Sequence, residues 1–265
     1  GGMTGVLLAV PPADFVLHNS LFLVAHFHNV IIGGVVFGLF AGMVYWFPKA
    51  FGFKLDEFWG KVSFWCWLVG FWLAFTPLYI MGLMGITRRL SQFEDTSLSL
   101  FFIIAAVGAA LVGIGILAFI MSIVVAVKNR KQLADTTGDP WNGRTLEWAT
   151  SSPPPSYNFA FTPVIHEIDA WNDMKKHGYQ RPTTGFVPIH MPKNTGAGVV
   201  LSAISVVLAF GLVWHIWWLA GVSFVGLIVA AIWHTFNYDR EFYIPAQEVQ
   251  DTEDQRTREL AQQAL

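Results

Sequence analysis

The sequence predicts an all-α integral membrane protein with about five transmembrane helices. Hydrophobic residues make up 54% of the 265 positions, and charged residues make up only 13%. Soluble domains carry roughly twice that share of charged residues. Several apolar stretches reach the length of about 20 residues that a helix needs to cross a bilayer. A water-soluble globular domain is therefore excluded, and the single cysteine excludes a disulfide framework.

Residues 1–127 are predicted to form one helical membrane region. The first ten residues are apolar but too short to cross a membrane, so we interpret them as the end of a helix. We therefore expect the chain to be the C-terminal part of a longer polypeptide. Three spans should follow, at residues 19–47, 60–85 and 97–127, the last of which contains no charged residue.

Residues 128–196 form a polar connection, and their composition leaves open whether this is an ordered loop or a linker. The apolar stretch that follows, at 197–237, is too long for one span. An aromatic cluster of the kind found at membrane interfaces, at 214–218, divides it into two expected helices, at 197–213 and 217–236. The polar tail, 238–265, is expected to form a short surface helix.

The distribution of basic residues orients these spans. All but two of the 16 Lys and Arg residues lie on alternate connections or in the tail, and the exceptions are Arg88 and Arg89. Cytoplasmic connections carry an excess of Lys and Arg. The lysine-rich connections and the C-terminus are therefore predicted to be cytoplasmic, and Arg88 and Arg89 to face outward.

Two histidines, His26 and His28, lie inside the first span. Ionisable residues at membrane depth usually mark function. Because each helical residue turns by about 100°, the two imidazoles should point about 200° apart. They could not share one metal, but they could each serve a different centre, and heme iron takes axial imidazole ligands. The alternatives are packed polar histidines and a proton relay.

A second candidate group lies at the outer end of the spans. Paired guanidinium groups bind carboxylates in a bidentate fashion, so Arg88 and Arg89 are suited to heme propionates. Asp14 and His18 precede the first span on the same side. The alternative for the arginine pair is a solvated interface anchor.

The sequence resembles subunit I of the heme–copper oxidases in three places. Residues 18–30 resemble the tenth transmembrane helix of that family, residues 87–89 its propionate-binding arginine pair, and residues 139–155 its cytoplasmic signature after helix twelve. Three features resemble the quinol-oxidising members. Asn19 stands where cytochrome c oxidases typically have a magnesium-binding aspartate, and residues 190–194 lead into two extra spans. The His-Ile-Trp-Trp cluster at 215–218 also resembles that group.

This resemblance implies a role for each candidate residue. His26 would be the axial ligand of the high-spin heme, of o or a type, where oxygen is reduced. His28 would be one of two ligands of the low-spin heme b. Arg88 and Arg89 would hold propionates, with Asp14 and His18 nearby. The copper ligands would lie upstream of this chain, so the chain alone is expected to be inactive.

The resemblance also implies the setting of the whole enzyme. It would be a proton-pumping oxidase of the bacterial inner membrane that reduces oxygen to water with electrons from ubiquinol. Its partners would be subunits II, III and IV and the lipid bilayer, with no nucleic acid. The runner-up is cytochrome c oxidase subunit I. The alternative from another class is half of a membrane transporter that uses His26 and His28 as a proton relay.

Overall fold

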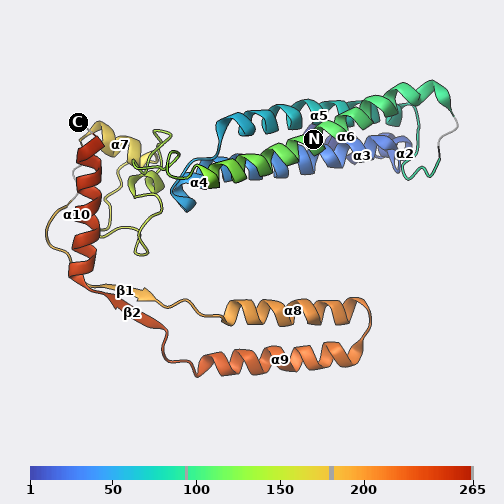
Figure 1. Ribbon diagram of the computed structural model, residues 1–265. Coiled ribbons are helices and arrows are strands. Elements are labelled where there is room, and N and C mark those ends of the chain that lie inside the picture. Colours follow the sequence, from blue (N-terminus) through green and yellow to red (C-terminus); the bar gives the residue numbers. More distant parts are fainter. Residues whose placement is uncertain (93–94, 179–181, 264–265) are drawn as a thin grey trace. The chain divides into compact units, whose positions relative to one another are not determined.

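The computed structural model describes residues 1–92, 95–178 and 182–263. The chain divides into two units (Figure 1). The first unit comprises Gly1–Pro154 and Ile165–Gly178, and the second comprises Pro155–Val164 and Tyr179–Leu265.

The first unit is a helical bundle. Two short helices, α1 (Gly2–Ala9) and α2 (Pro11–Leu17), precede a long helical segment. That segment consists of α3 (Leu21–His28), the π-helical η1 (Asn29–Val36) and α4 (Phe37–Phe51). The helix α5 (Glu57–Leu83) and the 3₁₀ turn η2 (Thr96–Leu98), which leads into α6 (Ser99–Lys128), complete the bundle.

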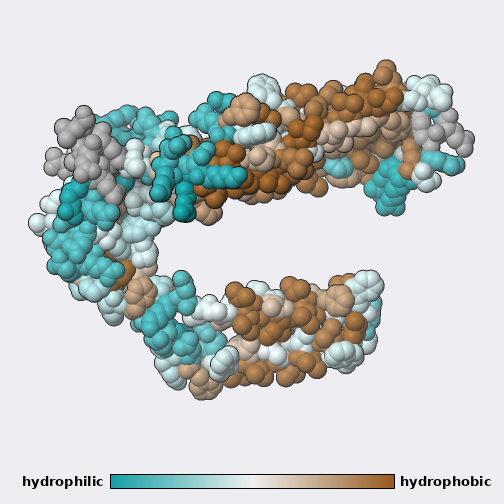
Figure 2. All heavy atoms as spheres, in the orientation of Figure 1, coloured by the Kyte–Doolittle hydropathy of each residue, from teal (hydrophilic) through white to brown (hydrophobic). Residues whose placement is uncertain are grey.

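Among the described residues, four helices are long and apolar enough to cross a membrane, at Leu21–Phe51, Glu57–Leu83, Thr96–Lys128 and Trp217–Thr235. The fifth expected span is α8 (Ala197–Val213), whose 17 residues lie at the short end of the usual range of about 17–25. Apolar residues cover the sides of these helices (Figure 2). The prediction of a helical, multi-pass membrane protein is therefore confirmed.

The helices α5 and α6 approach each other closely through glycines. A Cβ built on Gly108 would lie 2.2 Å from the backbone nitrogen of Ala74, and one on Gly70 would lie 2.8 Å from the carbonyl oxygen of Gly108. Small residues permit such contact between membrane helices. No larger side chain fits at this crossing unless the helices move apart.

The close contact at Gly108 predicts a loss of stability when this residue is enlarged. The substitution Gly108→Ala should destabilise the full-length protein by about 1–3 kcal/mol, the usual cost of overpacking. Gly113→Ala on the same helix is the matched control, because a Cβ there meets nothing within 4 Å. Thermal unfolding in detergent measures the difference. Equal melting temperatures for the two variants would show that the crossing is not as tight as described.

The beginning of α3 is fixed to the loop that follows α5. The Ser20 side chain caps the helix by accepting a hydrogen bond from the Phe22 backbone N–H at 3.1 Å. Backbone hydrogen bonds then join Leu21 N to Ile86 O at 2.9 Å and Arg88 N to Asn19 O at 2.9 Å. The two segments run antiparallel here, which places residue 88 beside the residues just before α3.

The polar connection after α6 is ordered against the end of α4. The ammonium group of Lys49 is buried and donates to the carbonyl oxygens of Gly138 (2.9 Å), Thr150 (2.9 Å) and Ser151 (3.2 Å). It also lies 5.1 Å from the ring centre of Trp148, which is fully buried. This part of the connection therefore packs against the end of α4.

The second unit contains a helical hairpin. The helices α8 and α9 (Trp217–Thr235) are joined by a tight turn, in which His215 has a φ of 56°. The short strands β1 (Ile189–Pro192) and β2 (Glu241–Ile244) pair in antiparallel fashion outside the hairpin. The helix α10 (Ala246–Gln263) lies in the polar tail. The sequence did not predict the strands, because four residues are too few for a recognisable alternating pattern.

Candidate heme-ligand site

His26 presents one ring nitrogen to a hydrogen-bond partner, and the described residues offer no hydrogen bond to the other. Its Nδ1 lies 2.8 Å from the hydroxyl oxygen of Thr4 on α1. The same hydroxyl donates its proton to the carbonyl oxygen of Gly1 at 3.0 Å. With that proton on the Gly1 carbonyl, the Thr4 oxygen is free to accept from Nδ1–H of His26. This arrangement favours the tautomer in which Nε2 carries a lone pair.

His28 is held in the same tautomer as His26, but by a backbone carbonyl oxygen. Its Nδ1 lies 2.8 Å from the carbonyl oxygen of Val24, one turn earlier in α3. A carbonyl oxygen only accepts, so Nδ1 carries the proton and Nε2 carries the lone pair. The imidazole also stacks on the ring of Phe75 in α5, with centroids 4.4 Å apart and planes at 18°.

Both imidazoles are thus prepared as metal ligands. In metal sites the ring nitrogen that does not bind the metal usually donates to a carbonyl or another acceptor, which fixes the tautomer and the ring orientation. Among the described residues, no hydrogen bond occupies Nε2 of His26 or His28. His26 contacts Thr4 of α1 and His28 contacts Phe75 of α5. They lie two residues apart in α3, so their side chains leave the helix about 200° apart. Their roles as heme ligands stay predictions.

The region just before α3 holds the other predicted residues. The carboxylate of Asp14 lies 3.4 Å from Nδ1 of His18. The backbone of Arg88 is hydrogen-bonded to Asn19, the residue after His18. Arg89 is exposed and has a φ of 65°. Within the described part of the chain, no ion pair joins either arginine to Asp14 or His18.

Arg88 has a buried nitrogen without a partner. Its Nε is shielded from solvent and makes no hydrogen bond within the described residues. Buried polar atoms are nearly always satisfied, and a charged donor left unpaired is costly. An anionic carboxylate would satisfy it, so the residues present fit a heme propionate at this position.

The described residues do not form a multi-ligand site of the kind that copper requires. Across residues 1–92, 95–178 and 182–263, no group of three or more His, Cys, Asp and Glu side chains is placed to hold a metal ion.

Two residues of the site were not predicted from sequence. Thr4 holds the imidazole of His26, and the hydroxyl of Tyr79 lies 3.3 Å from that of Thr4. Both contacts join distant positions in the chain, and neither residue belongs to a recognisable motif. Only the three-dimensional arrangement of α1, α3 and α5 identifies them.

The chain is similar in sequence to known oxidase subunits. Residues 1–111 match the family model described as cytochrome c and quinol oxidase polypeptide I. The chain is 53% identical to cytochrome bo(3) ubiquinol oxidase subunit 1 of Buchnera aphidicola subsp. Acyrthosiphon pisum, over 100% of this chain and 40% of that protein. It is also 53% identical to ubiquinol oxidase subunit 1 of Acetobacter aceti, with the same coverage.

A relative with a different name is nearly as similar. The chain is 51% identical to a probable cytochrome c oxidase subunit 1 of Bradyrhizobium diazoefficiens, over 94% of this chain and 38% of that protein. The chain thus spans about 40% of the length of the curated relatives it matches. The matched region, 1–111, contains both histidines and the arginine pair. The chain is thus similar to the cytochrome c and quinol oxidase polypeptide I family, whose model matches residues 1–111 and whose ubiquinol oxidase members align with the whole chain.

Proposed function

We propose that this chain forms part of the catalytic subunit of a proton-pumping terminal oxidase that reduces oxygen to water with electrons from ubiquinol. The observation that carries the proposal is the pair of imidazoles on α3, each with Nδ1 hydrogen-bonded and Nε2 unengaged, on different sides of one helix. Several relatives at about half identity are named as ubiquinol oxidases, which favours ubiquinol as the electron donor.

Each histidine would bind one heme through Nε2. His26 would serve the high-spin heme, of o or a type, and His28 the low-spin heme b. The hemes, together with copper held elsewhere in the complete subunit, would supply the redox chemistry. The chain's own residues orient the ligands: Thr4 holds the ring of His26, while Val24 and Phe75 hold that of His28.

The arginine pair would hold heme propionates at the outer end. The unpartnered Nε of Arg88 supports this role. Arg89 is more exposed and would contact a propionate from the solvent side. Asp14 and His18, which pair with each other, would lie next to these groups and complete a polar cap over the site.

The complete enzyme would lie in the bacterial inner membrane with subunits II, III and IV. The asymmetry of basic residues supports a cytoplasmic C-terminus and an outward-facing loop at Arg88 and Arg89. Oxygen and ubiquinol would reach the complete enzyme from the bilayer and its surroundings.

Two rival functions make different predictions. A transporter half with a proton relay would need both ring nitrogens of each histidine to exchange protons, but Nδ1 of His28 is committed to a carbonyl of its own helix. Cytochrome c oxidase would use the same two histidines and differs in the electron donor. Because one relative is named as a probable cytochrome c oxidase, the experiment below includes cytochrome c as an electron donor.

The test uses the full-length polypeptide assembled with its partner subunits. Cyanide-sensitive oxygen consumption is measured with ubiquinol and, separately, with reduced cytochrome c. We expect turnover with ubiquinol only. Turnover with reduced cytochrome c only would instead identify the protein as part of a cytochrome c oxidase. A preparation without heme absorbance would favour the transporter.

The hydroxyl of Thr4 provides a finer test of the site. A donated hydrogen bond at Nδ1 makes an imidazole a more basic ligand. Thr4→Val removes the acceptor at nearly constant volume, so the heme bound by His26 should become easier to reduce and its iron–histidine stretching frequency should fall. Thr4→Ser keeps the hydroxyl and is the matched control. An unchanged stretching frequency in Thr4→Val would remove Thr4 from the site.

A further inference from the structure

The hydroxyl of Thr4 has three hydrogen-bond neighbours, which together use all of its hydrogen-bonding capacity. It lies 3.0 Å from the carbonyl oxygen of Gly1, 2.8 Å from Nδ1 of His26 and 3.3 Å from the hydroxyl oxygen of Tyr79. A hydroxyl group has one proton to donate and two lone pairs with which to accept. With the proton on the Gly1 carbonyl, one lone pair accepts from Nδ1–H of His26 and the other from the phenol of Tyr79.

Tyr79, near the end of α5, is held in place by α3. Its ring packs edge-to-face on Phe22, with ring centres 4.9 Å apart and planes at 71°. Phe22 is buried. Three residues later on α5, a Cβ on Gly82 would lie 2.0 Å from the backbone nitrogen of Phe22, so the two helices are in close contact here. The ring of Tyr79 is therefore fixed on α3, and its hydroxyl links α5 to Thr4 on α1.

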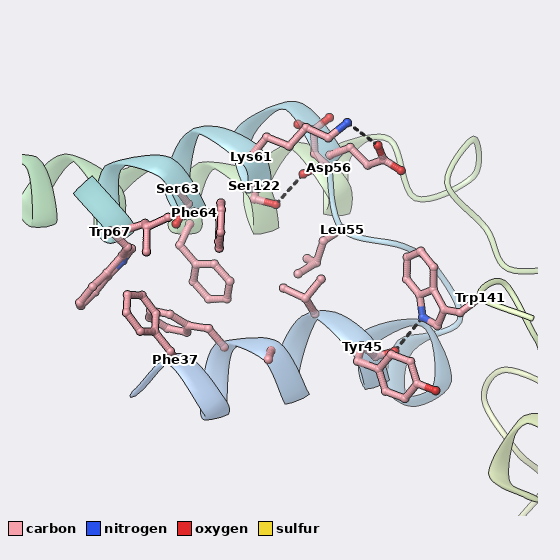
Figure 3. A pocket seen from close by; sticks show the side chains of 17 residues that line it. Phe37, Tyr45, Leu55, Asp56, Lys61, Ser63, Phe64, Trp67, Ser122 and Trp141 are labelled. Atoms are coloured by element: carbon pink, nitrogen blue, oxygen red, sulfur yellow. Dashed lines mark hydrogen bonds and ion pairs between the residues drawn. The ribbon is translucent and has the colours of Figure 1, made fainter. Parts of the chain in front are cut away.

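Two other hydroxyl groups between α5 and α6 bond only to the backbone. In the apolar groove beside these helices, Ser122 of α6 donates to the carbonyl oxygen of Asp56 at 2.9 Å (Figure 3). Ser63 of α5 donates to a backbone carbonyl oxygen of α6 at 2.8 Å. These bonds hold the two helices together. The hydroxyl of Tyr79 contacts instead the side chain that holds His26, so its removal should affect His26, whereas removal of the Ser63 hydroxyl should not.

The two donors at the Thr4 oxygen compete for its electron density. Hydrogen bonds polarise the groups that they join. The proton that Thr4 donates to Gly1 makes its oxygen a better acceptor, while the proton that this oxygen accepts from Tyr79 makes it a poorer acceptor for Nδ1–H of the histidine. A hydrogen-bond acceptor at the free ring nitrogen raises the basicity of an imidazole ligand. Tyr79 therefore opposes the effect of Thr4 on His26.

We propose that Tyr79 is a positioning residue for His26, which acts through Thr4 and weakens the hydrogen bond at Nδ1. This inference rests on the proposed role of His26 as the ligand of the high-spin heme. The distance of 3.3 Å between the hydroxyl oxygens of Tyr79 and Thr4 exceeds the usual range of about 2.5–3.0 Å for hydroxyl groups. The distance of 2.8 Å between Thr4 and His26 is an ordinary hydrogen bond. The effect of Tyr79 should therefore be smaller than that of Thr4 and opposite in sign.

The experiment is resonance Raman spectroscopy of the full-length protein with its partner subunits, which measures the iron–histidine stretching frequency of the reduced high-spin heme. Tyr79→Phe removes the hydroxyl and keeps the ring on Phe22, so the frequency should rise above that of the wild type. Thr4→Val should lower it. The double variant Thr4→Val/Tyr79→Phe should match Thr4→Val alone, because Tyr79 acts only through the Thr4 oxygen.

Ser63→Ala is the matched control, because it also removes a hydroxyl and its hydrogen bond from α5, and it should leave the frequency unchanged. If Tyr79→Phe fails to accumulate, Tyr79→Leu removes the same hydroxyl and should also raise the frequency. An unchanged or lower frequency on loss of this hydroxyl, or a double variant that differs from Thr4→Val, would overturn the proposal. A wild-type high-spin heme without an iron–histidine band would overturn the ligand role of His26 itself, and this inference with it.

Discussion

His28→Ala in the full-length protein should abolish the low-spin heme signal and leave the high-spin heme in place. His26→Ala should do the reverse and disturb the heme that binds oxygen and carbon monoxide. The reason is geometric, because the two rings leave α3 on different sides and are held by different neighbours, Thr4 for His26 and Phe75 for His28. Loss of an axial ligand should therefore affect one heme at a time.

Reduced-minus-oxidised spectra report the low-spin heme, and carbon monoxide difference spectra report the high-spin heme. Phe27→Ala is a useful control, since it truncates the residue between the two histidines without removing a ligand. If either histidine variant lost both signals equally while the protein stayed folded and inserted, the assignment of two hemes to two faces would have no basis.

Arg88→Gln should lower the midpoint potential of at least one heme, on the order of 50 mV for a one-electron couple. A nearby cation stabilises the reduced heme, whose net charge is one unit more negative than that of the oxidised form, and the interaction is strong where solvent is excluded. The buried, unpartnered Nε of Arg88 marks such a position.

Arg89→Gln is the matched comparison for this prediction. Arg89 is exposed, so solvent and salt should screen its charge and its substitution should shift the potential less. Redox titrations of both variants measure the two shifts. Unchanged potentials in both would return the arginine pair to the role of an interface anchor.

The membrane helices could be predicted from sequence because one physical requirement dominates them. Residues 97–127 lack charge, and the structure places α6 at Ser99–Lys128. The tight turn near His215 could likewise be predicted from the aromatic cluster that interrupts an overlong apolar stretch. Burial of backbone groups in lipid leaves few alternatives to a helix.

Other features depend on contacts between distant residues and leave no local signal. The π-helical segment Asn29–Val36 lies within the predicted span, and its ordinary apolar composition does not distinguish it from a regular helix. Such segments often occur near functional sites, and this one directly follows His28. The capture of Lys49 by carbonyl oxygens of the loop at 138–151 is equally invisible in the sequence, because carbonyl groups are common to all residues.

Some features of the candidate site could be predicted from sequence, and others could not. His26 and His28 could be found because ionisable residues are rare at membrane depth. Their opposite directions followed from the helical period, which holds because both lie in α3 before the π-helical segment begins. The hydrogen bond from His26 to Thr4 could not be predicted, because it depends on how α1 packs beside α3.

The most direct test of the central claim is a cryo-electron-microscopy map of the full-length protein with its partner subunits, at a resolution that shows the imidazole rings. The account predicts Nε2 of His26 and Nε2 of His28 at coordination distance from two different heme irons, on opposite sides of α3. A map in which either Nε2 contacts only protein, or in which both rings approach the same group, would contradict it.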